Sequence, residues 1–240
     1  IALADYAAFL DERATFMGQW GLKPSRAEDG ASYEELVQTE GRPRLRYWLD
    51  RILAEGMIDA SVDYGYFPAY AEGDVLVILH HGDDPTGILG TPGLLAPDGG
   101  SGGPIGTERL RFSFPRQRRD RHLCLADYVR SRESGQVDVV ALQLVTAGSA
   151  VDAFTAQMFA ENKYRDYLEL NGLTMQLTEA LAEYWHSRVR AELGFAAEDP
   201  TDIAGMFKLN YRGARFSLGY PACPDMEDRL KVVELLKPER

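Results

Sequence analysis

Residues 210–225 read Asn-Tyr-Arg-Gly-Ala-Arg-Phe-Ser-Leu-Gly-Tyr-Pro-Ala-Cys-Pro-Asp and follow neither helix nor strand periodicity. Within them, Gly213 and Gly219 permit backbone conformations that are closed to other residues. Pro221 and Pro224 fix φ and remove two amide donors. This composition predicts an ordered irregular loop, for which the helices and strands of the chain serve as scaffold.

Four side chains indicate what such a loop does. Arg212 and Arg215 supply two guanidinium groups three residues apart, and Tyr211 and Tyr220 add flat amphipathic surfaces. A small anionic or zwitterionic molecule would suit this set of groups. The other interpretation is a turn rich in glycine and proline whose arginines lie in solvent, and the residue types alone leave both open.

The overall composition is that of a globular protein with a sizeable core. Of 240 residues, 45% are hydrophobic and 10% aromatic, and no apolar run approaches the roughly 18 to 20 residues that span a bilayer. The first residues lack the basic segment of a signal peptide, so we expect a cytoplasmic protein without a membrane partner. The net charge of −11 repels nucleic acid, which we therefore exclude as a partner.

Cysteines and histidines occur in no pattern typical of a disulfide framework or a metal site. Cys124 and Cys223 lie far apart and outside any Cys-x-x-Cys or Cys/His spacing, so we expect two free thiols. His80 and His81 are adjacent on an expected strand and point to opposite faces, which disfavours a shared ion. We predict no metal site.

Apolar periodicity predicts helices and strands without a regular βαβ rhythm. Helices are expected over residues 3–19, from residue 32, and over 43–55, 150–193 with an interruption near Gly172, 201–208 and 229–236. Strands are expected over residues 61–67, broken at Pro68, and over 74–80, 107–114 and 137–145, the last as a central strand buried on both faces. The order predicts an α+β fold, with a mainly antiparallel sheet covered by helices in a single domain over residues 1–240.

Three carboxylates on these expected helices are candidates for chemistry. Asp11 lies near the apolar stripe of the first helix, where a carboxylate is commonly a solvated flank. Glu179 and Glu183 are one turn apart on one helix face, and His186 follows on nearly the same face. Paired carboxylates can act as general acid and base, but an exposed helix face explains them too, and both interpretations stay open.

Two further segments stand out by composition. Residues 82–106 are rich in glycine and proline without the Lys-Ser/Thr of a phosphate-binding loop, and we interpret them as a flexible insertion. Pro115-Arg116-Gln117-Arg118-Arg119-Asp120-Arg121 is a dense basic run in an acidic chain. It is either a solvated turn or a patch that binds an anion or a partner.

The stretch from Arg212 to Asp225 resembles the signature of the C-terminal activation domain of cobalamin-dependent methionine synthase, the domain that binds S-adenosylmethionine. Two prolines and a cysteine at fixed places make this match specific. Further resemblances cover nearly the whole chain, at residues 11–20, Tyr66-Phe67-Pro68-Ala69, Cys124-Leu125-Ala126-Asp127-Tyr128 and residues 179–186.

The resemblance implies a reactivation module within a methyltransferase of methionine biosynthesis, the 5-methyltetrahydrofolate-homocysteine methyltransferase. Such a module positions S-adenosylmethionine as methyl donor for reductive methylation of cob(II)alamin, with flavodoxin or an equivalent reductase supplying the electron. The chain has no Asp-x-His-x-x-Gly cobalamin signature. The implied source of cobalamin is therefore a neighbouring, cobalamin-binding domain of the same polypeptide.

The same resemblance, carried over residue by residue, implies the S-adenosylmethionine-binding residues Asp11, Glu179, Arg215, Ser217, Gly219 and Tyr220. The two carboxylates would stabilise the sulfonium charge, the arginine and loop amides would hold the methionine carboxylate, and the tyrosine would pack against the ligand. It implies no catalytic residue in this chain, because the reduced cobalt is itself the nucleophile.

The chain also departs from the family. Leu209 stands where some members carry an acidic residue, and the family continues past Arg240 into a segment with a tyrosine pair beside the ligand. The chain begins at Ile1 without methionine, in what reads as the middle of a helix. We expect a fragment of a longer polypeptide, C-terminally incomplete relative to the family.

An alternative function of another class is a pure binding module. In that interpretation the loop arginines and the basic run at residues 116–121 form a docking surface for a partner domain or a reductase, and the chain takes no part in chemistry. Saturable binding of S-adenosylmethionine distinguishes the two.

Overall fold

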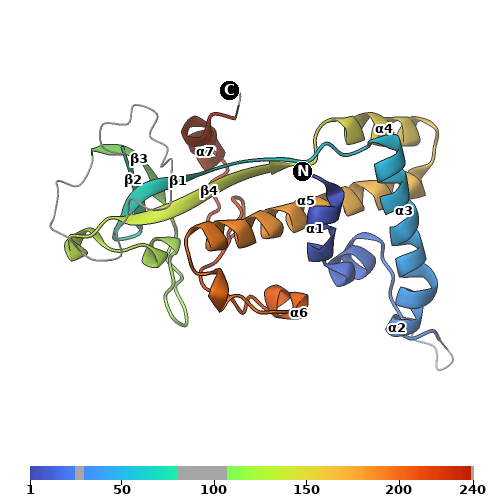
Figure 1. Ribbon diagram of the computed structural model, residues 1–240, viewed down its shortest axis with the longest axis horizontal. Coiled ribbons are helices and arrows are strands. Elements are labelled where there is room, and N and C mark those ends of the chain that lie inside the picture. The colour runs from blue at the N-terminus through green and yellow to red at the C-terminus, as the bar shows by residue number, and fades with distance from the viewer. Residues whose placement is uncertain (25–29, 81–106, 239–240) are drawn as a thin grey trace. The chain divides into compact units, whose positions relative to one another are not determined.

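A computed structural model of the chain describes residues 1–24, 30–80 and 107–238. It combines helices with a four-stranded sheet, so the predicted α+β class is confirmed (Figure 1). The internal contacts divide into two compact units, neither of which is a continuous stretch of chain. The helical unit comprises Ile1–Val62, Val145–Arg188 and Pro200–Lys208, and the sheet unit comprises Asp63–Leu144, Val189–Asp199 and Leu209–Arg240.

The helices of the helical unit follow the predicted order. They are α1 (Leu3–Tyr6), α2 (Tyr33–Leu36), α3 (Arg42–Glu55), α4 (Ala150–Ala160), most of α5 (Tyr164–Glu192) and α6 (Ile203–Phe207). α2 begins at its predicted cap, where the Ser32 hydroxyl accepts a hydrogen bond from the Glu35 N–H at 3.2 Å. The long region breaks at residues 161–163 and not at Gly172, which lies inside α5 so close to Gln19 that a Cβ would meet it at 2.7 Å.

The prediction of one continuous first helix over residues 3–19 is wrong. α1 passes into a 3-10 turn, Ala7–Phe9, and a separate π-helical segment, Ala14–Gln19, follows. Asp11 lies at the break, where its Oδ1 accepts a hydrogen bond from the N–H of Ala14 at 2.9 Å. A short carboxylate that satisfies an otherwise free amide favours a new helix start over continuation.

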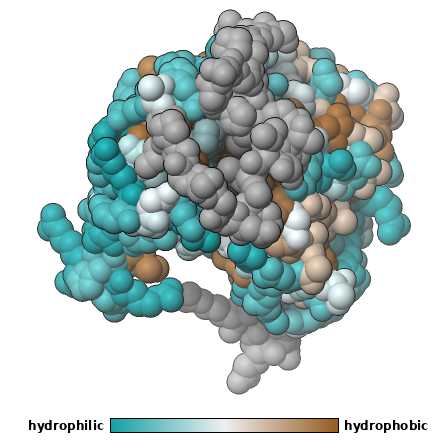
Figure 2. Space-filling view, turned by 60° about the vertical axis from the view of Figure 1, so that its left-hand side comes forward, coloured by the Kyte–Doolittle hydropathy of each residue, from teal (hydrophilic) through white to brown (hydrophobic). Residues whose placement is uncertain are grey.

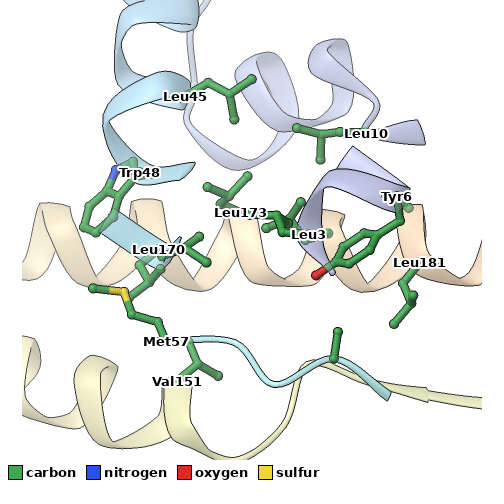
Figure 3. Close-up of a cluster of buried hydrophobic side chains, with 14 of the residues drawn as sticks. Leu3, Tyr6, Leu10, Leu45, Trp48, Met57, Val151, Leu170, Leu173 and Leu181 are labelled. Atoms are coloured by element: carbon green, nitrogen blue, oxygen red, sulfur yellow. The ribbon is translucent and has the colours of Figure 1, made fainter. Parts of the chain in front are cut away.

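Side chains from several helices enclose one apolar core in the helical unit (Figure 3). α3 contributes Trp48, which is almost fully buried and whose Nε1 donates a hydrogen bond to Oε2 of Glu169 at 2.9 Å. The core therefore takes in a large indole without leaving its N–H unsatisfied. α5 supplies the fully buried leucines Leu170, Leu173, Leu177 and Leu181.

The sheet has the strand order β3-β2-β1-β4. The strands are β1 (Ser61–Glu72), β2 (Val75–Leu79), β3 (Glu108–Ser113) and β4 (Asp138–Thr146). β2 pairs antiparallel with β1, with Ala69 opposite Ile78, and antiparallel with β3, with Leu76 opposite Phe112. A turn at Gly73, with φ of 61°, joins β1 to β2 as predicted. The mainly antiparallel sheet is confirmed.

Two strand predictions are wrong. β1 continues through Pro68 to Glu72, because its pairing with β2 begins at Ala69 and makes no use of the missing proline N–H. The apolar strand over residues 138–146 lies at an edge of the sheet, not at its centre, and is half-buried along nearly its whole length. One face of that strand packs into the sheet core through Val140, Leu142 and Leu144.

The last helix, α7 (Asp228–Leu236), covers this sheet core. Its Val232 and Leu235 are buried in one cluster with Phe67 and Ile78 of the sheet. α7 directly follows residues 210–225, so burial of its apolar face holds the C-terminal end of that loop against the sheet.

The surface in the view of Figure 2 is mostly hydrophilic, with smaller hydrophobic patches. Among the described residues, no helix combines the length and the hydropathy needed to cross a membrane. The same residues contain no cluster of three or more His, Cys, Asp or Glu side chains that could hold a metal ion. His81 and the Gly-rich stretch 82–106 lie outside the described residues.

Candidate functional site

The predicted irregular loop lies between α6 and α7. Residues 208–227 contain no helix or strand apart from an isolated bridge between Tyr220 and Cys223. From residue 209 onward the loop belongs to the sheet unit. Its two ends are held in different ways.

Hydrogen bonds within the loop shape its rear end, residues 217–223. The N–H of Gly219 donates to the Cys223 carbonyl, and the N–H of Cys223 donates to the Tyr220 carbonyl, both at 2.9 Å. The Cys223 thiol donates to the Ser217 carbonyl at 3.0 Å, and burial raises the pKa of this thiol. Gly219 has φ of 100°, a conformation that glycine adopts without strain.

Side chains hold the front end of the loop, residues 211–215, against residues 190–199, which we call the floor segment. Arg190, at the end of α5, is 1% exposed, and its Cζ lies 4.0 Å from the centroid of the Tyr211 ring. Its Nε donates to both carboxylate oxygens of Asp199, at 2.7 and 3.0 Å. A buried guanidinium is thus paired along its edge and covered on its face.

A second contact joins the front end to the floor segment nearer to solvent. Nη1 of Arg212 donates to Oε1 of Glu198 at 3.1 Å, and the guanidinium stacks 5.0 Å from the Phe195 ring centroid. Both partners of this ion pair are more than half exposed. Arg212 is therefore engaged on the floor segment.

Four of the predicted ligand residues lie on this loop. Arg215 and Ser217 are half-buried, whereas Gly219 and Tyr220 are exposed. A guanidinium beside a glycine backbone can hold a carboxylate, because arginine offers paired donors and glycine lets a ligand approach main-chain amides. The exposed Tyr220 ring offers a flat surface for an apolar part of the same ligand.

The remaining two predicted ligand residues, Asp11 and Glu179, belong to the helical unit. Both carboxylates are exposed, and Asp11 has the capping role described above. Glu183, one turn beyond Glu179 on α5, is buried and lies 3.7 Å from Nδ1 of His186. The pair that the sequence places on one helix face therefore divides into an exposed and a buried carboxylate.

A hollow of about 200 Å³ lies beside the loop in the sheet unit. Its walls come from the loop and from residues 115–128, which contain the segment after β3 and the 3-10 turn Leu125–Tyr128. The lining residues include Pro115, Leu123, Tyr128, Phe216, Pro221 and Ala222. The rings of Tyr128 and Phe216 are 5.6 Å apart, and both are about half exposed. The motif that ends in Tyr128 thus lies next to the loop.

The basic run borders this hollow. Arg116 pairs with Asp74 and with Asp127, each at 2.7 Å, and hydrogen bonds to these carboxylates raise the pKa of its guanidinium. Arg118, Arg119 and Arg121 are exposed and form no ion pair with any described residue. The run therefore contains one structural arginine and three that are available to a partner.

The sequence did not reveal the link between Arg190 and Asp199. The two residues are separated by a turn at Gly194, which has φ of 86°, and no periodic pattern connects them. The one sequence feature that could have pointed to this link is the arginine in the last turn of a long helix. A basic residue there is commonly explained by its favourable interaction with the helix dipole. The tertiary contact with Tyr211 gives it another role.

A solved structure described as the "MetH Reactivation Domain bound to AdoHcy" has the same fold, with a TM-score of 0.75 and 24% identity, over 99% of this chain and 68% of that one. The family model for "Vitamin B12 dependent methionine synthase, activation domain" matches residues 16–240. The chain belongs to this family, as the motifs indicated.

Two curated relatives are methionine synthases of mycobacteria. The protein of Mycobacterium tuberculosis is 53% identical over 251 aligned positions, and that of Mycobacterium leprae is 52% identical over the same length. Both alignments cover the whole of this chain, which spans 19% of the length of either relative.

Proposed function

We propose that the chain is the S-adenosylmethionine-binding reactivation module of a cobalamin-dependent methionine synthase, a methyltransferase of methionine biosynthesis. Its task is to position the methyl donor for reductive methylation of cobalamin. The family match over residues 16–240 carries this proposal. The related reactivation domain that was solved with AdoHcy supports it, since AdoHcy is the demethylated form of the same ligand.

The residues of the loop fit a methionine-like ligand. Arg215 would pair with the carboxylate, Ser217 and the Gly219 backbone would add hydrogen bonds, and Tyr220 would pack against the ligand. Asp11 and Glu179 would offset the positive charge of the sulfonium or the α-amino group. These groups bind and orient, so the rate gain from this chain comes from positioning. Cobalamin, when present, supplies the nucleophilic cobalt.

The proposed partners follow from the size of the relatives. Since the chain spans 19% of either methionine synthase, we place the cobalamin-binding domain elsewhere in the same polypeptide. Flavodoxin or an equivalent reductase would supply the electron. We take residues 1–240 as one activation domain that works in the cytoplasm, where two free buried cysteines would remain reduced.

Calorimetric titration of S-adenosylmethionine tests the proposal. We expect saturable binding, and we expect Arg215→Ala to weaken it by about 2 to 4 kcal/mol, the range for removing one partner of a desolvated charge pair. Arg212→Ala is the matched control, because Arg212 is engaged with Glu198 and Phe195. Equal losses in the two variants would mean that the loop presents its arginines differently.

Asp11→Asn tests the contribution of the helical unit to binding. Asparagine caps a helix about as well as aspartate, so the hydrogen bond to Ala14 is retained while the charge is removed. We expect affinity to fall by about 1 to 3 kcal/mol. Asp5→Asn, at an exposed position in α1, is the control. Unchanged affinity in both variants would remove Asp11 from the site.

The hollow beside the basic run favours a second candidate function, a docking module. Arg116 lines an apolar hollow with two half-exposed rings, and the exposed Arg118, Arg119 and Arg121 follow it in the same basic run. An acidic partner domain or reductase would fit this surface. A docking module predicts salt-sensitive partner binding that the triple Arg→Glu variant abolishes, together with no saturable binding of S-adenosylmethionine.

A further inference from the structure

Arg190 is an unusual group for the inside of a protein. Its side chain is 1% exposed, yet it carries a permanent positive charge. Taking such a charge out of water is unfavourable unless it is well paired. Asp199 accepts two hydrogen bonds from its Nε, and the Tyr211 ring lies across it at 4.0 Å. The guanidinium thus joins the floor segment to the first residues of the loop.

The base of this arrangement is fastened to the sheet. Glu192, two residues beyond Arg190, accepts hydrogen bonds from the hydroxyl of Tyr66 at 2.6 Å and from that of Tyr64 at 3.1 Å. Burial and the hydrogen bond to Glu192 raise the pKa of Tyr66, so its hydroxyl stays a donor well beyond the pH at which a free tyrosine ionises. Because two donors on β1 hold one carboxylate, the last turn of α5 has little freedom to shift.

Tyr211 transmits this rigidity to the loop. It is half-buried and lies four residues before Arg215, the residue to which we assign the ligand carboxylate. The guanidinium carbon lies 4.0 Å from the ring centroid, and this contact favours one position of the ring, because a cation is attracted to the face of the ring and not to its edge. The backbone that leads to Arg215 therefore starts from a defined position.

We propose that Arg190, acting through Tyr211, is a positioning residue that sets where Arg215 meets the carboxylate of S-adenosylmethionine. This inference rests on the proposed function and adds a residue that makes no contact with the ligand itself. Asp199 contributes to the same positioning because it pairs with the charge of Arg190. The predicted signature is selective: the recognition of the carboxylate is lost, while the contacts to the rest of the ligand remain.

The experiment compares the affinity for S-adenosylmethionine with that for decarboxylated S-adenosylmethionine, which keeps the sulfonium and the amino group. In the unmodified chain we expect the carboxylated ligand to bind at least about tenfold more tightly, in line with one charged hydrogen-bonded contact. In Tyr211→Ala this preference should fall to about twofold or less, with the affinity for the decarboxylated ligand nearly unchanged. Tyr211→Phe keeps the ring and should retain the full preference.

Arg190→Lys provides the second arm. Lysine keeps the charge but offers neither the planar face nor the edge that Asp199 uses, so the preference should fall as in Tyr211→Ala. Thermal unfolding shows whether Arg190→Lys folds. If it does not, the comparison of Tyr211→Ala with Tyr211→Phe decides whether the inference holds. An equal loss of affinity for both ligands would show a merely structural role and overturn the inference. Absence of saturable binding to the unmodified chain would instead refute the proposed function.

Discussion

The two ends of the loop over residues 210–225 reach order by different routes. The rear end closes on itself, through backbone hydrogen bonds between Gly219, Tyr220 and Cys223. The front end depends on another part of the chain, because Tyr211 and Arg212 are placed by side chains of the floor segment. A local turn can be read from its residue types, whereas a tertiary support cannot, and substitutions at the two ends should differ accordingly.

The largest effect is expected at the front end. Arg190→Met leaves the Asp199 carboxylate without its buried partner and should lower the free energy of unfolding by about 3 to 5 kcal/mol. Arg188 is exposed and lies two residues before Arg190 on α5. Arg188→Met should change the free energy of unfolding by less than about 1 kcal/mol. Urea denaturation measures both. Similar small losses would mean that the front end does not depend on Arg190.

A smaller effect is expected at the rear end. Gly219→Ala places a side chain at φ of 100°, and the strain should lower stability by about 1 to 2 kcal/mol. Its Cβ would also lie 2.6 Å from Sδ of Met226, which must move. Gly213→Ala has φ of 86° and no atom within 4 Å, so it isolates the backbone strain. If Gly219→Ala were the milder variant, the rear end would not hold this conformation in solution.

The pH dependence of stability tests the hydrogen bond that Cys223 makes within the rear end. Cys223→Ala removes the hydrogen bond to Ser217 and should cost about 1 kcal/mol at pH 7. Because burial raises the pKa of the folded thiol, its stabilisation is present below the unfolded pKa of about 8.5 and is lost as the pH rises through the folded value. Urea curves from pH 7 to pH 10 should show the two proteins converging. Parallel curves would contradict a buried neutral thiol.

The smallest effect is expected for the exposed contact at the front end. Arg212 and Glu198 are 62% and 53% exposed, and a pair so open to water contributes little. Arg212→Ala should therefore change the free energy of unfolding by less than about 0.5 kcal/mol. A loss comparable with that of Arg190→Met would mean that the stacking on Phe195, not burial of Arg190, holds the loop.

Periodicity predicted most elements of the fold, and its errors have local causes. The first helix breaks because Asp11 caps a new start, a preference that a stripe of apolar residues does not reveal. β1 passes Pro68 because only the residues after it pair with β2. The apolar strand β4 lies at the sheet edge, since the hydrophobicity of a strand does not report which neighbours it has.

The sequence by itself determined the irregular loop, the α+β class and the family, because glycine and proline restrict the backbone locally and the motif is contiguous. It also named the candidate ligand residues, which remain a proposal. Only the tertiary structure decided that Arg190 is buried under Tyr211 and paired with Asp199. The physical reason is that burial and charge pairing arise between segments far apart in sequence, where no local preference specifies the partner.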